Sequence, residues 1–229
     1  MHIQLFSDGG EPFLANVVEA CRDILAGVSQ PRIAYLPAAS VDDTYFRPAN
    51  AALRPLGTVV TLDADSQPLA KMVEELERAS VVFMPGGNTY LLSQRLHKSG
   101  LFEPLRDKVR AGLPLVGVSA GSVMCGLKML TTNDMNCCAC VYFDGMALAP
   151  YYLNVHFPTA DGPERALRIE RLWEFHFFFS EPVIALEDSA CLVIDETGTT
   201  LTRGVAWRIE WGKDTPVRIE PGAQVAGAS

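Results

Sequence analysis

The first half of the chain alternates short apolar runs with longer amphipathic segments, and this alternation limits the fold more than any other feature. Each run is rich in β-branched residues and is bounded by glycine, proline or aspartate, as is typical of strands in a sheet covered on both faces. The runs are Ile3–Phe6, Ile33–Leu36, Val59–Leu62, Val81–Met84 and Leu115–Val118. Strands that alternate with helices form βαβ units, so the pattern predicts a parallel sheet.

The segments between these runs have the periodicity of helices. Within Phe13–Ala26, apolar residues recur at Val17, Val18, Cys21 and Ile24, which lie on one helical face. The other helical segments are Leu69–Arg78, Tyr90–His97 and Leu101–Ala111. Helices that connect parallel strands cover both faces of the sheet, so we expect a three-layer α/β/α fold with a mostly parallel sheet.

The second half of the chain has a different pattern. A strand at Tyr151–Val155 and a helix at Glu164–Phe175 precede four further strand-like runs, at Val183–Leu186, Cys191–Ile194, Thr199–Thr202 and Ala206–Trp211. The last two flank Arg203-Gly204 and resemble a closing antiparallel hairpin. We find no repeat or flexible linker, and we therefore expect one domain over residues 1–229 that ends in antiparallel strands.

Composition narrows the classes of function. A net charge of −8 argues against nonspecific nucleic-acid binding, which requires lysine and arginine to neutralise phosphates. The N-terminus has no basic segment followed by a long apolar one, and no run of about 18 apolar residues suggests a membrane span. The six cysteines do not form a spaced disulfide framework, so we expect reduced thiols and a cytoplasmic location.

The strongest local motif is a G-x-S-x-G segment at Gly117–Gly121. It joins the apolar run Leu113–Val118 to a stretch of helical spacing, Val123–Leu130. In this context the motif predicts a nucleophile elbow, a sharp strand-to-helix turn that presents Ser119 at the carboxyl end of a sheet. The N–H of Ala120 would then stabilise an oxyanion. The alternative is a turn of small residues that packs a helix onto a sheet.

A second glycine turn follows the strand Val81–Met84, in the sequence Pro-Gly-Gly-Asn-Thr at 85–89. Carboxyl ends of parallel strands meet at one edge of the sheet, so Gly87 can supply a second oxyanion donor near the serine. A phosphate-binding turn is the alternative. Neither G-x-x-x-x-G-K-[ST] nor G-x-G-x-x-G is present, which makes nucleotide binding the weaker interpretation.

A nucleophilic serine needs a base, and the base needs an acid that orients it. Of the four histidines, His156 ends a strand and can reach the rim of the sheet, whereas His2, His97 and His176 suit terminal, solvated and packing roles. The acid candidates are the Glu187-Asp188 pair, between two strand-like runs, and Asp134. Each carboxylate could equally be an exposed loop residue.

Several further blocks occur around these residues in a fixed order. They are Pro-Gly-Gly-Asn-Thr at 85–89, Ser-Ala-Gly at 119–121, Thr-Thr-Asn-Asp-Met at 131–135, Phe143-Asp144 and Asn154-Val155-His156-Phe157. In these blocks, and over nearly its whole length, the chain resembles the serine peptidase family that contains dipeptidase E, an aspartyl dipeptidase, and cyanophycinase. Matching blocks at matching spacings are far more specific than one G-x-S-x-G.

The resemblance implies a Ser-His-Glu triad on a glutamine-amidotransferase-like sheet. It assigns Ser119 as nucleophile and His156 as general base. A Glu-x-x-x-x-x-Val pattern through Val193 favours Glu187 as the acid, whereas anchoring on Leu186 favours Asp188, so we prefer Glu187 with Asp188 as the alternative. The acid follows the histidine in the chain, unlike in ordinary α/β-hydrolases.

The resemblance also implies a substrate, namely dipeptides with N-terminal aspartate, and no cofactor or metal. An Arg-x-x-Arg-Ile pattern assigns Arg165 to the aspartate side chain, because a guanidinium suits bidentate recognition of a carboxylate. Asp134 matches a carboxylate at the edge of the family's active site and would hold the substrate's α-amino group. Asn88, in the Pro-Gly-Gly-Asn-Thr block, is grouped with these substrate-binding residues.

One segment departs from the family pattern. Residues 136–140 read Asn-Cys-Cys-Ala-Cys where the aspartyl dipeptidases have a proline and an aspartate, which leaves the substrate open. The cysteines lack zinc-ligand spacing, so we expect reduced thiols that line a pocket. The alternatives are a cyanophycinase-like or β-aspartyl peptidase and a non-catalytic binding module on the same fold. A small peptide is the expected partner, and a homodimer is compatible with the sequence.

Overall fold

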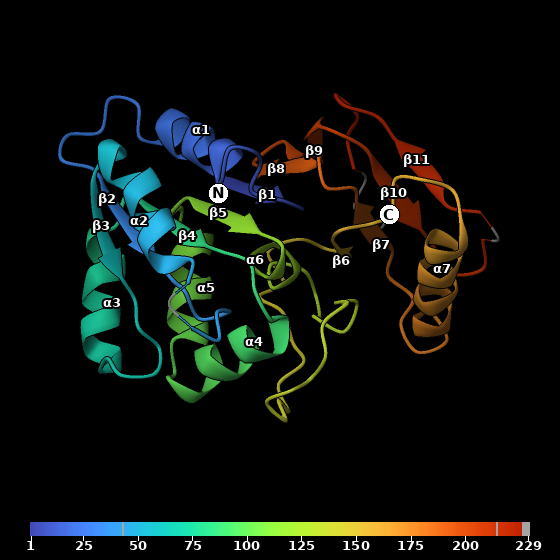
Figure 1. Ribbon diagram of the computed structural model, residues 1–229, viewed down its shortest axis with the longest axis horizontal. Coiled ribbons are helices and arrows are strands. Elements are labelled where there is room, and N and C mark those ends of the chain that lie inside the picture. Colours follow the sequence, from blue (N-terminus) through green and yellow to red (C-terminus); the bar gives the residue numbers. More distant parts are fainter. Residues whose placement is uncertain (43, 214, 226–229) are drawn as a thin grey trace.

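A seven-stranded sheet forms the centre of the computed structural model, which describes residues 1–42, 44–213 and 215–225 (Figure 1). Its order is β3-β2-β4-β5-β1-β8-β9, in which the strands from β3 to β1 are parallel and β8 and β9 are antiparallel. The strands are β1 (Ile3–Phe6), β2 (Arg32–Tyr35), β3 (Thr58–Thr61), β4 (Val81–Met84), β5 (Leu115–Val118), β8 (Cys191–Asp195) and β9 (Gly198–Arg203). The predicted mostly parallel sheet is therefore confirmed.

Helices cover both faces of this sheet. One face is covered by α1 (Ala15–Ile24) and α2 (Phe46–Leu53), and a short 3-10 turn, Arg54–Leu56, follows α2. The other face is covered by α3 (Leu69–Arg78), α4 (Thr89–Lys98) and α5 (Phe102–Arg110). Successive residues of β4 alternate between the two cores: Val81 and Phe83 pack with α1 and α2, and Val82 and Met84 pack with the other helices. This period of two is what a strand buried on both faces requires, and it confirms the three layers. None of the described helices is long and apolar enough to cross a membrane.

A second, four-stranded sheet was not predicted. Its order is β11-β10-β7-β6, and it consists of β6 (Tyr152–Asn154), β7 (Val183–Leu186), β10 (Ala206–Ile209) and β11 (Val217–Ile219). The helix α7 (Pro163–Phe175) packs on it through Leu172, beside Tyr152 and Val183. The second sheet and α7 lie to one side of the seven-stranded sheet (Figure 1).

The predicted hairpin around Arg203-Gly204 is wrong. β9 pairs with β8 in the first sheet, whereas β10 pairs with β7 and β11 in the second. At Gly204 the φ angle is 70°, and an added Cβ would collide with the backbone at Ser189, so only glycine fits where the chain crosses between the sheets. Periodicity identified both strands, but it carries no information about their partners.

The two sheets meet where β1 and β5 of the first sheet and β6 and β7 of the second end. Residues 187–190 lead from β7 in the second sheet to β8 in the first. The end of β1 contacts this connection, since the N–H of Ser7 donates to the carbonyl oxygen of Ala190 at 3.2 Å. β5, the neighbour of β1, also ends at this edge. The junction therefore gathers residues from four strands of two sheets.

Candidate active site

Ser119 lies on a sharp turn between β5 and α6 (Ala120–Val123). Its backbone has φ 50° and ψ −112°, a conformation that is strained for a residue with a side chain and is common at functional sites. An added Cβ at Gly121 would collide with the carbonyl oxygen of Met84, so the close contact with β4 requires glycine. The N–H of Ser119 donates to the carbonyl oxygen of Phe6 at 3.0 Å, which fixes the turn to β1.

The helix after the serine is shorter than predicted. The stretch Val123–Leu130 was expected to be helical, but α6 ends at Val123. The chain instead turns so that Gly126 packs against the backbone of Tyr151, where an added Cβ would lie 3.0 Å from the carbonyl oxygen. The apolar residues that suggested a helix here are buried or half-buried in a turn. Ala120 is the first residue of α6, a position where the N–H has no partner within the helix.

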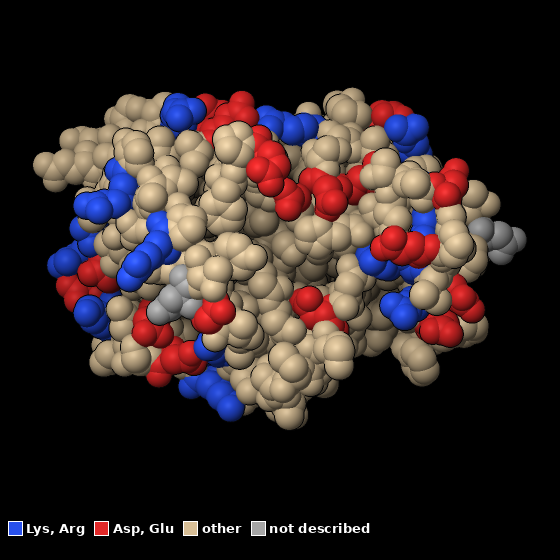
Figure 2. Space-filling view, viewed as in Figure 1, with Lys and Arg blue, Asp and Glu red and all other residues tan. Residues whose placement is uncertain are grey.

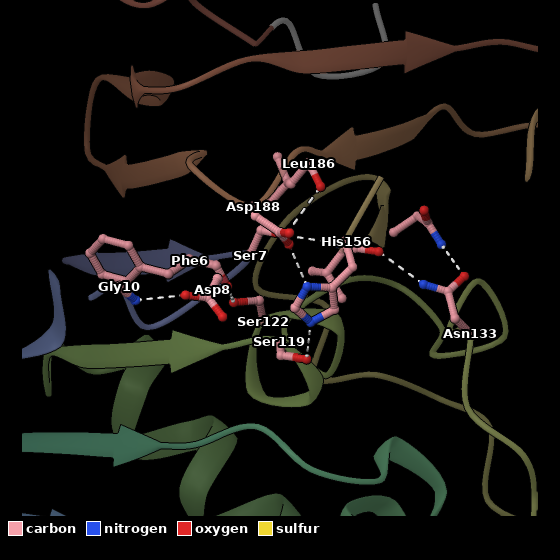
Figure 3. Close-up of polar contacts among 12 residues, drawn as sticks. Phe6, Ser7, Asp8, Gly10, Ser119, Ser122, Asn133, His156, Leu186 and Asp188 are labelled. Atoms are coloured by element: carbon pink, nitrogen blue, oxygen red, sulfur yellow. Dashed lines mark hydrogen bonds and ion pairs between the residues drawn. The ribbon is translucent and has the colours of Figure 1, made fainter. Parts of the chain in front are cut away.

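A continuous chain of hydrogen bonds leads from the serine to a carboxylate (Figure 3). The hydroxyl oxygen of Ser119 lies 2.9 Å from Nε2 of His156, and Nδ1 of His156 lies 2.5 Å from Oδ1 of Asp188. The side chains of His156 and Asp188 are 42% and 69% exposed, so this pair faces water. With Nδ1 protonated and bonded to the carboxylate, Nε2 is free to accept the proton of the serine.

The geometry places Asp188, the alternative acid, in contact with His156, whereas the preferred Glu187 bonds elsewhere. Glu187 is buried, and its Oε1 accepts a hydrogen bond from Nε1 of Trp207 at 2.9 Å. Glu187 directly follows β7, and its side chain bonds to Trp207 of β10. Asp188 begins the turn after it, and its side chain bonds to His156. The side chains of adjacent residues in an extended segment point to opposite sides. Matching the family's acid to residue 187 in place of 188 therefore selects a side chain that points away from the histidine.

Two side chains hold the backbone that carries His156. The φ angle of His156 is 54°, another unusual value for a residue with a side chain. Nη1 of Arg168 donates to the carbonyl oxygens of His156 at 3.2 Å and Val155 at 3.4 Å. Nδ2 of Asn133 donates to the same Val155 oxygen at 2.9 Å. Sequence reasoning missed Arg168 and Asn133 in this role, since no motif marks a side chain that bonds to a carbonyl.

The second glycine turn lies against the serine. An added Cβ at Gly86 would lie 3.1 Å from Cβ of Ser119, and the φ angle of Gly87 is 135°. A side chain at Gly87 would also collide with the carbonyl oxygen of Ala39. Glycine at both positions therefore allows this backbone to approach Ser119, and the role of Gly87 as an oxyanion donor stays a prediction.

Ser119 and His156 open onto a cavity of about 420 Å³. Its wall includes two carboxylates, Asp8 and Glu11, and the described lining residues contain no lysine or arginine. Burial raises the pKa of Tyr35, also in the wall, to about 12, so its phenol is neutral at ordinary pH. On the face of the molecule drawn in Figure 2, several acidic side chains surround a central hollow. A neighbouring cavity of about 480 Å³ shares Tyr35 but does not include the serine.

Asn88 and Asp134 both bind protein groups at the start of α4. Oδ2 of Asp134 accepts hydrogen bonds from the N–H of Thr89 at 2.7 Å, the hydroxyl of Thr89 at 2.6 Å and the hydroxyl of Thr132 at 3.0 Å. Asn88 caps α4 through the N–H of Leu91 and donates to the carbonyl oxygen of Met135, each at 3.0 Å. Neither lines the cavity beside Ser119, and their contact with substrate stays a prediction.

Arg165 is a buried residue near the start of α7. Its Cζ lies 3.9 Å from the centroid of the Trp207 ring and 5.3 Å from that of Phe157. Nη1 donates to the carbonyl oxygen of Thr159 at 3.1 Å and lies 3.3 Å from Asp161. Arg165 does not line the cavity beside Ser119, so its role in recognising aspartate stays a prediction.

The cysteine-rich loop packs beside α4. Cys137 is exposed, Cys138 is half-buried and Cys140 is buried, and all three are free thiols. Nε2 of Gln94 holds the loop through the carbonyl oxygen of Cys138 at 3.0 Å. None of the three lines the cavity beside Ser119. Within the described parts of the chain, no three histidine, cysteine or acidic side chains are grouped as a metal site would need.

A serine on a strained elbow, bonded to a histidine that is bonded to a carboxylate, defines the class of serine hydrolases. The sequence profile of Peptidase family S51 matches residues 4–202, and the chain belongs to that family and is a serine peptidase. Peptidase E of Streptomyces coelicolor is 35% identical over 203 residues, which cover 85% of this chain and 81% of the relative. The probable alpha-aspartyl dipeptidase of Drosophila melanogaster is 30% identical over 184 residues, covering 78% and 75%.

Solved structures show the same fold. A putative Peptidase E from Listeria monocytogenes superposes with a TM-score of 0.71 at 19% identity, covering 88% of this chain and 98% of that one. A peptidase from an acI-B1 actinobacterium superposes with a TM-score of 0.67 at 15% identity, covering 98% and 96%. The fold expected from the sequence is therefore confirmed.

Proposed function

We propose that this enzyme hydrolyses dipeptides with N-terminal aspartate through Ser119, His156 and Asp188. The observation that carries the mechanism is the chain of hydrogen bonds from the serine through the imidazole to the carboxylate. The names of the relatives, Peptidase E and probable alpha-aspartyl dipeptidase, support the substrate. The cytoplasmic location and the homodimer stay predictions.

The proposed reaction has two halves. The Ser119 hydroxyl attacks the scissile carbonyl, and Nε2 of His156 takes its proton and delivers it to the leaving amine. Water then attacks the acyl-enzyme with His156 again as base, and the acid product leaves. Asp188 holds the imidazole and stabilises its cationic form, while the N–H groups of Gly87 and Ala120 stabilise each tetrahedral oxyanion.

Substrates that differ only in charge test the preference for aspartate. Asp-Leu and Asn-Leu have nearly the same shape, but only aspartate carries a carboxylate. A hydrogen bond to a charged group contributes about 1.5–3 kcal/mol, so kcat/KM for Asp-Leu should exceed that for Asn-Leu by about 10- to 150-fold. Leucine release measures both rates. Equal rates would contradict aspartate selectivity while leaving the peptidase mechanism intact.

The cavity beside Ser119 favours a second candidate, in which the residue after aspartate is arginine. The rings of Phe13 and Tyr45 line this cavity, stack with centroids 5.9 Å apart and are 43% and 59% exposed. Exposed rings beside the carboxylates of Asp8 and Glu11 suit a guanidinium, through cation–π contacts and charged hydrogen bonds. The peptide would then be Asp-Arg with an α link, or with the β link of a cyanophycinase-like or β-aspartyl peptidase. Comparing the two linkages separates these enzymes.

Neutralising Glu11 tests this candidate. Glu11→Gln should lower kcat/KM for Asp-Arg by about two- to five-fold, the range of an exposed ion pair, and leave Asp-Leu unchanged. Added salt should reduce the Asp-Arg rate in the same direction, because it screens exposed charges. Glu196→Gln is the matched control, since Glu196 is exposed in the β8–β9 turn and does not line the cavity. An unchanged Asp-Arg rate in Glu11→Gln argues against arginine in this cavity.

A further inference from the structure

A second serine at the site takes no part in the proposed chemistry. Ser7 follows β1, and the residue is fully buried. Its hydroxyl donates to the carbonyl oxygen of Leu186 at 3.1 Å and accepts from the N–H of His156 at 2.8 Å (Figure 3). One buried hydroxyl therefore bonds both to the segment that carries the base and to the strand that leads to Asp188.

This bridge spans the junction between the two sheets. Ser119 follows β5 in the seven-stranded sheet and is fixed to β1 through the carbonyl oxygen of Phe6. His156 and Asp188 come after β6 and β7 of the four-stranded sheet. The nucleophile and its two partners thus belong to different sheets, and Ser7, the residue after Phe6, connects them.

The bridge acts most directly on the histidine. The carbonyl oxygen of Leu186 also accepts from the N–H of Phe157 at 2.9 Å, so it keeps a partner if the hydroxyl is removed. The N–H of His156 would lose its acceptor, at a residue whose φ angle of 54° must be maintained by its surroundings. We propose that Ser7 is a positioning residue that holds the imidazole of His156 within reach of Ser119. This inference rests on the proposed roles of Ser119 and His156.

Removing the hydroxyl should lower turnover without weakening substrate binding. For Ser7→Ala we expect kcat per active site to fall by about 10- to 100-fold, the loss typical of misplaced catalytic groups. Ser7 is not among the residues that line the cavity, so KM should stay within about two-fold. Titration with a serine-directed phosphonate counts active sites, and initial rates on Asp-Leu below the unfolding temperature give kcat.

Two variants separate positioning from packing. Ser7→Cys nearly preserves the volume but forms weaker hydrogen bonds, so its kcat should lie between wild type and Ser7→Ala. It also carries the test if the alanine variant does not fold. Ser93→Ala is the control. Ser93 lies in α4 and is fully buried, and its hydroxyl donates to the carbonyl oxygen of Tyr142 at 2.8 Å. It should lose stability but keep kcat per active site.

The outcomes distinguish this inference from the proposed function. Wild-type enzyme that neither labels with the phosphonate nor cleaves any peptide contradicts the proposed function. Active wild type with an unchanged kcat in both Ser7 variants overturns the role of Ser7 alone. A rise in KM at constant kcat also overturns it, because a residue that positions the base affects the chemical step.

Discussion

Replacing Ser119 with alanine should reduce peptide hydrolysis to background. Loss of the nucleophile from a serine triad lowers kcat by about 10⁶-fold, nearly as much as loss of the whole triad, because the histidine and carboxylate then have nothing to activate. Alanine takes the same strained backbone at residue 119, where φ is 50°, so the fold should be retained. Dipeptide hydrolysis followed by amine release, with circular dichroism to confirm folding, measures both effects.

Chemical labelling provides a second test of the role of Ser119. Wild-type enzyme should react with a serine-directed phosphonate at one site, and Ser119→Ala should not. Full turnover of Asp-Leu by the alanine variant would show that another group attacks the peptide and would exclude the mechanism proposed for Ser119.

The second large effect concerns the choice between two adjacent carboxylates. Asp188→Asn should lower kcat by about 10²- to 10⁴-fold, because an amide nitrogen facing Nδ1 favours the wrong imidazole tautomer. The lower part of this range allows for the exposure of Asp188, whose side chain is 69% accessible, since water can replace part of its interaction. Initial rates at saturating dipeptide give kcat.

Glu187→Gln is the matched control for that variant. Nε1 of Trp207 donates to Oε1 of Glu187 at 2.9 Å, and the amide oxygen of a glutamine can still accept this hydrogen bond. We therefore expect kcat to change by less than about two-fold. We expect a loss of about 1 kcal/mol in the free energy of unfolding, from the weaker neutral hydrogen bond. The reverse result, in which Glu187→Gln abolishes activity and Asp188→Asn does not, would restore Glu187 as the acid.

Local sequence patterns predicted the elements of the central sheet well. β1, β4 and β5 have the predicted bounds, and β2 and β3 each begin and end one residue earlier than predicted. These strands are short, rich in apolar residues and bounded by glycine, proline or aspartate, so the chain segment itself carries the signal. The second sheet was missed because the pairing of β10 with β7 depends on residues distant in sequence. The helix α2 was missed because proline and asparagine weaken its helical pattern.

The site was predictable where a motif fixes the backbone. Ser119 and His156 lie in hydrogen-bond contact, as their places at the ends of strands suggested. The family pattern favoured Glu187 over Asp188, and the sequence could not reveal which of the two side chains points toward His156 at this turn. Arg165 illustrates the same limit, since its match in sequence does not reveal that its guanidinium stacks on Trp207. Ser7 lies in no motif, and only its contacts identify it.

The proposed triad is divided between two sheets, and this division affects how the enzyme would lose activity. The bond between Ser119 and His156 crosses the junction, whereas the backbone hydrogen bonds of each sheet lie within that sheet. A small rotation of one sheet against the other would separate the reacting atoms and leave every strand intact. Activity therefore measures the alignment of the two sheets, which spectroscopic measures of helix and strand content do not detect.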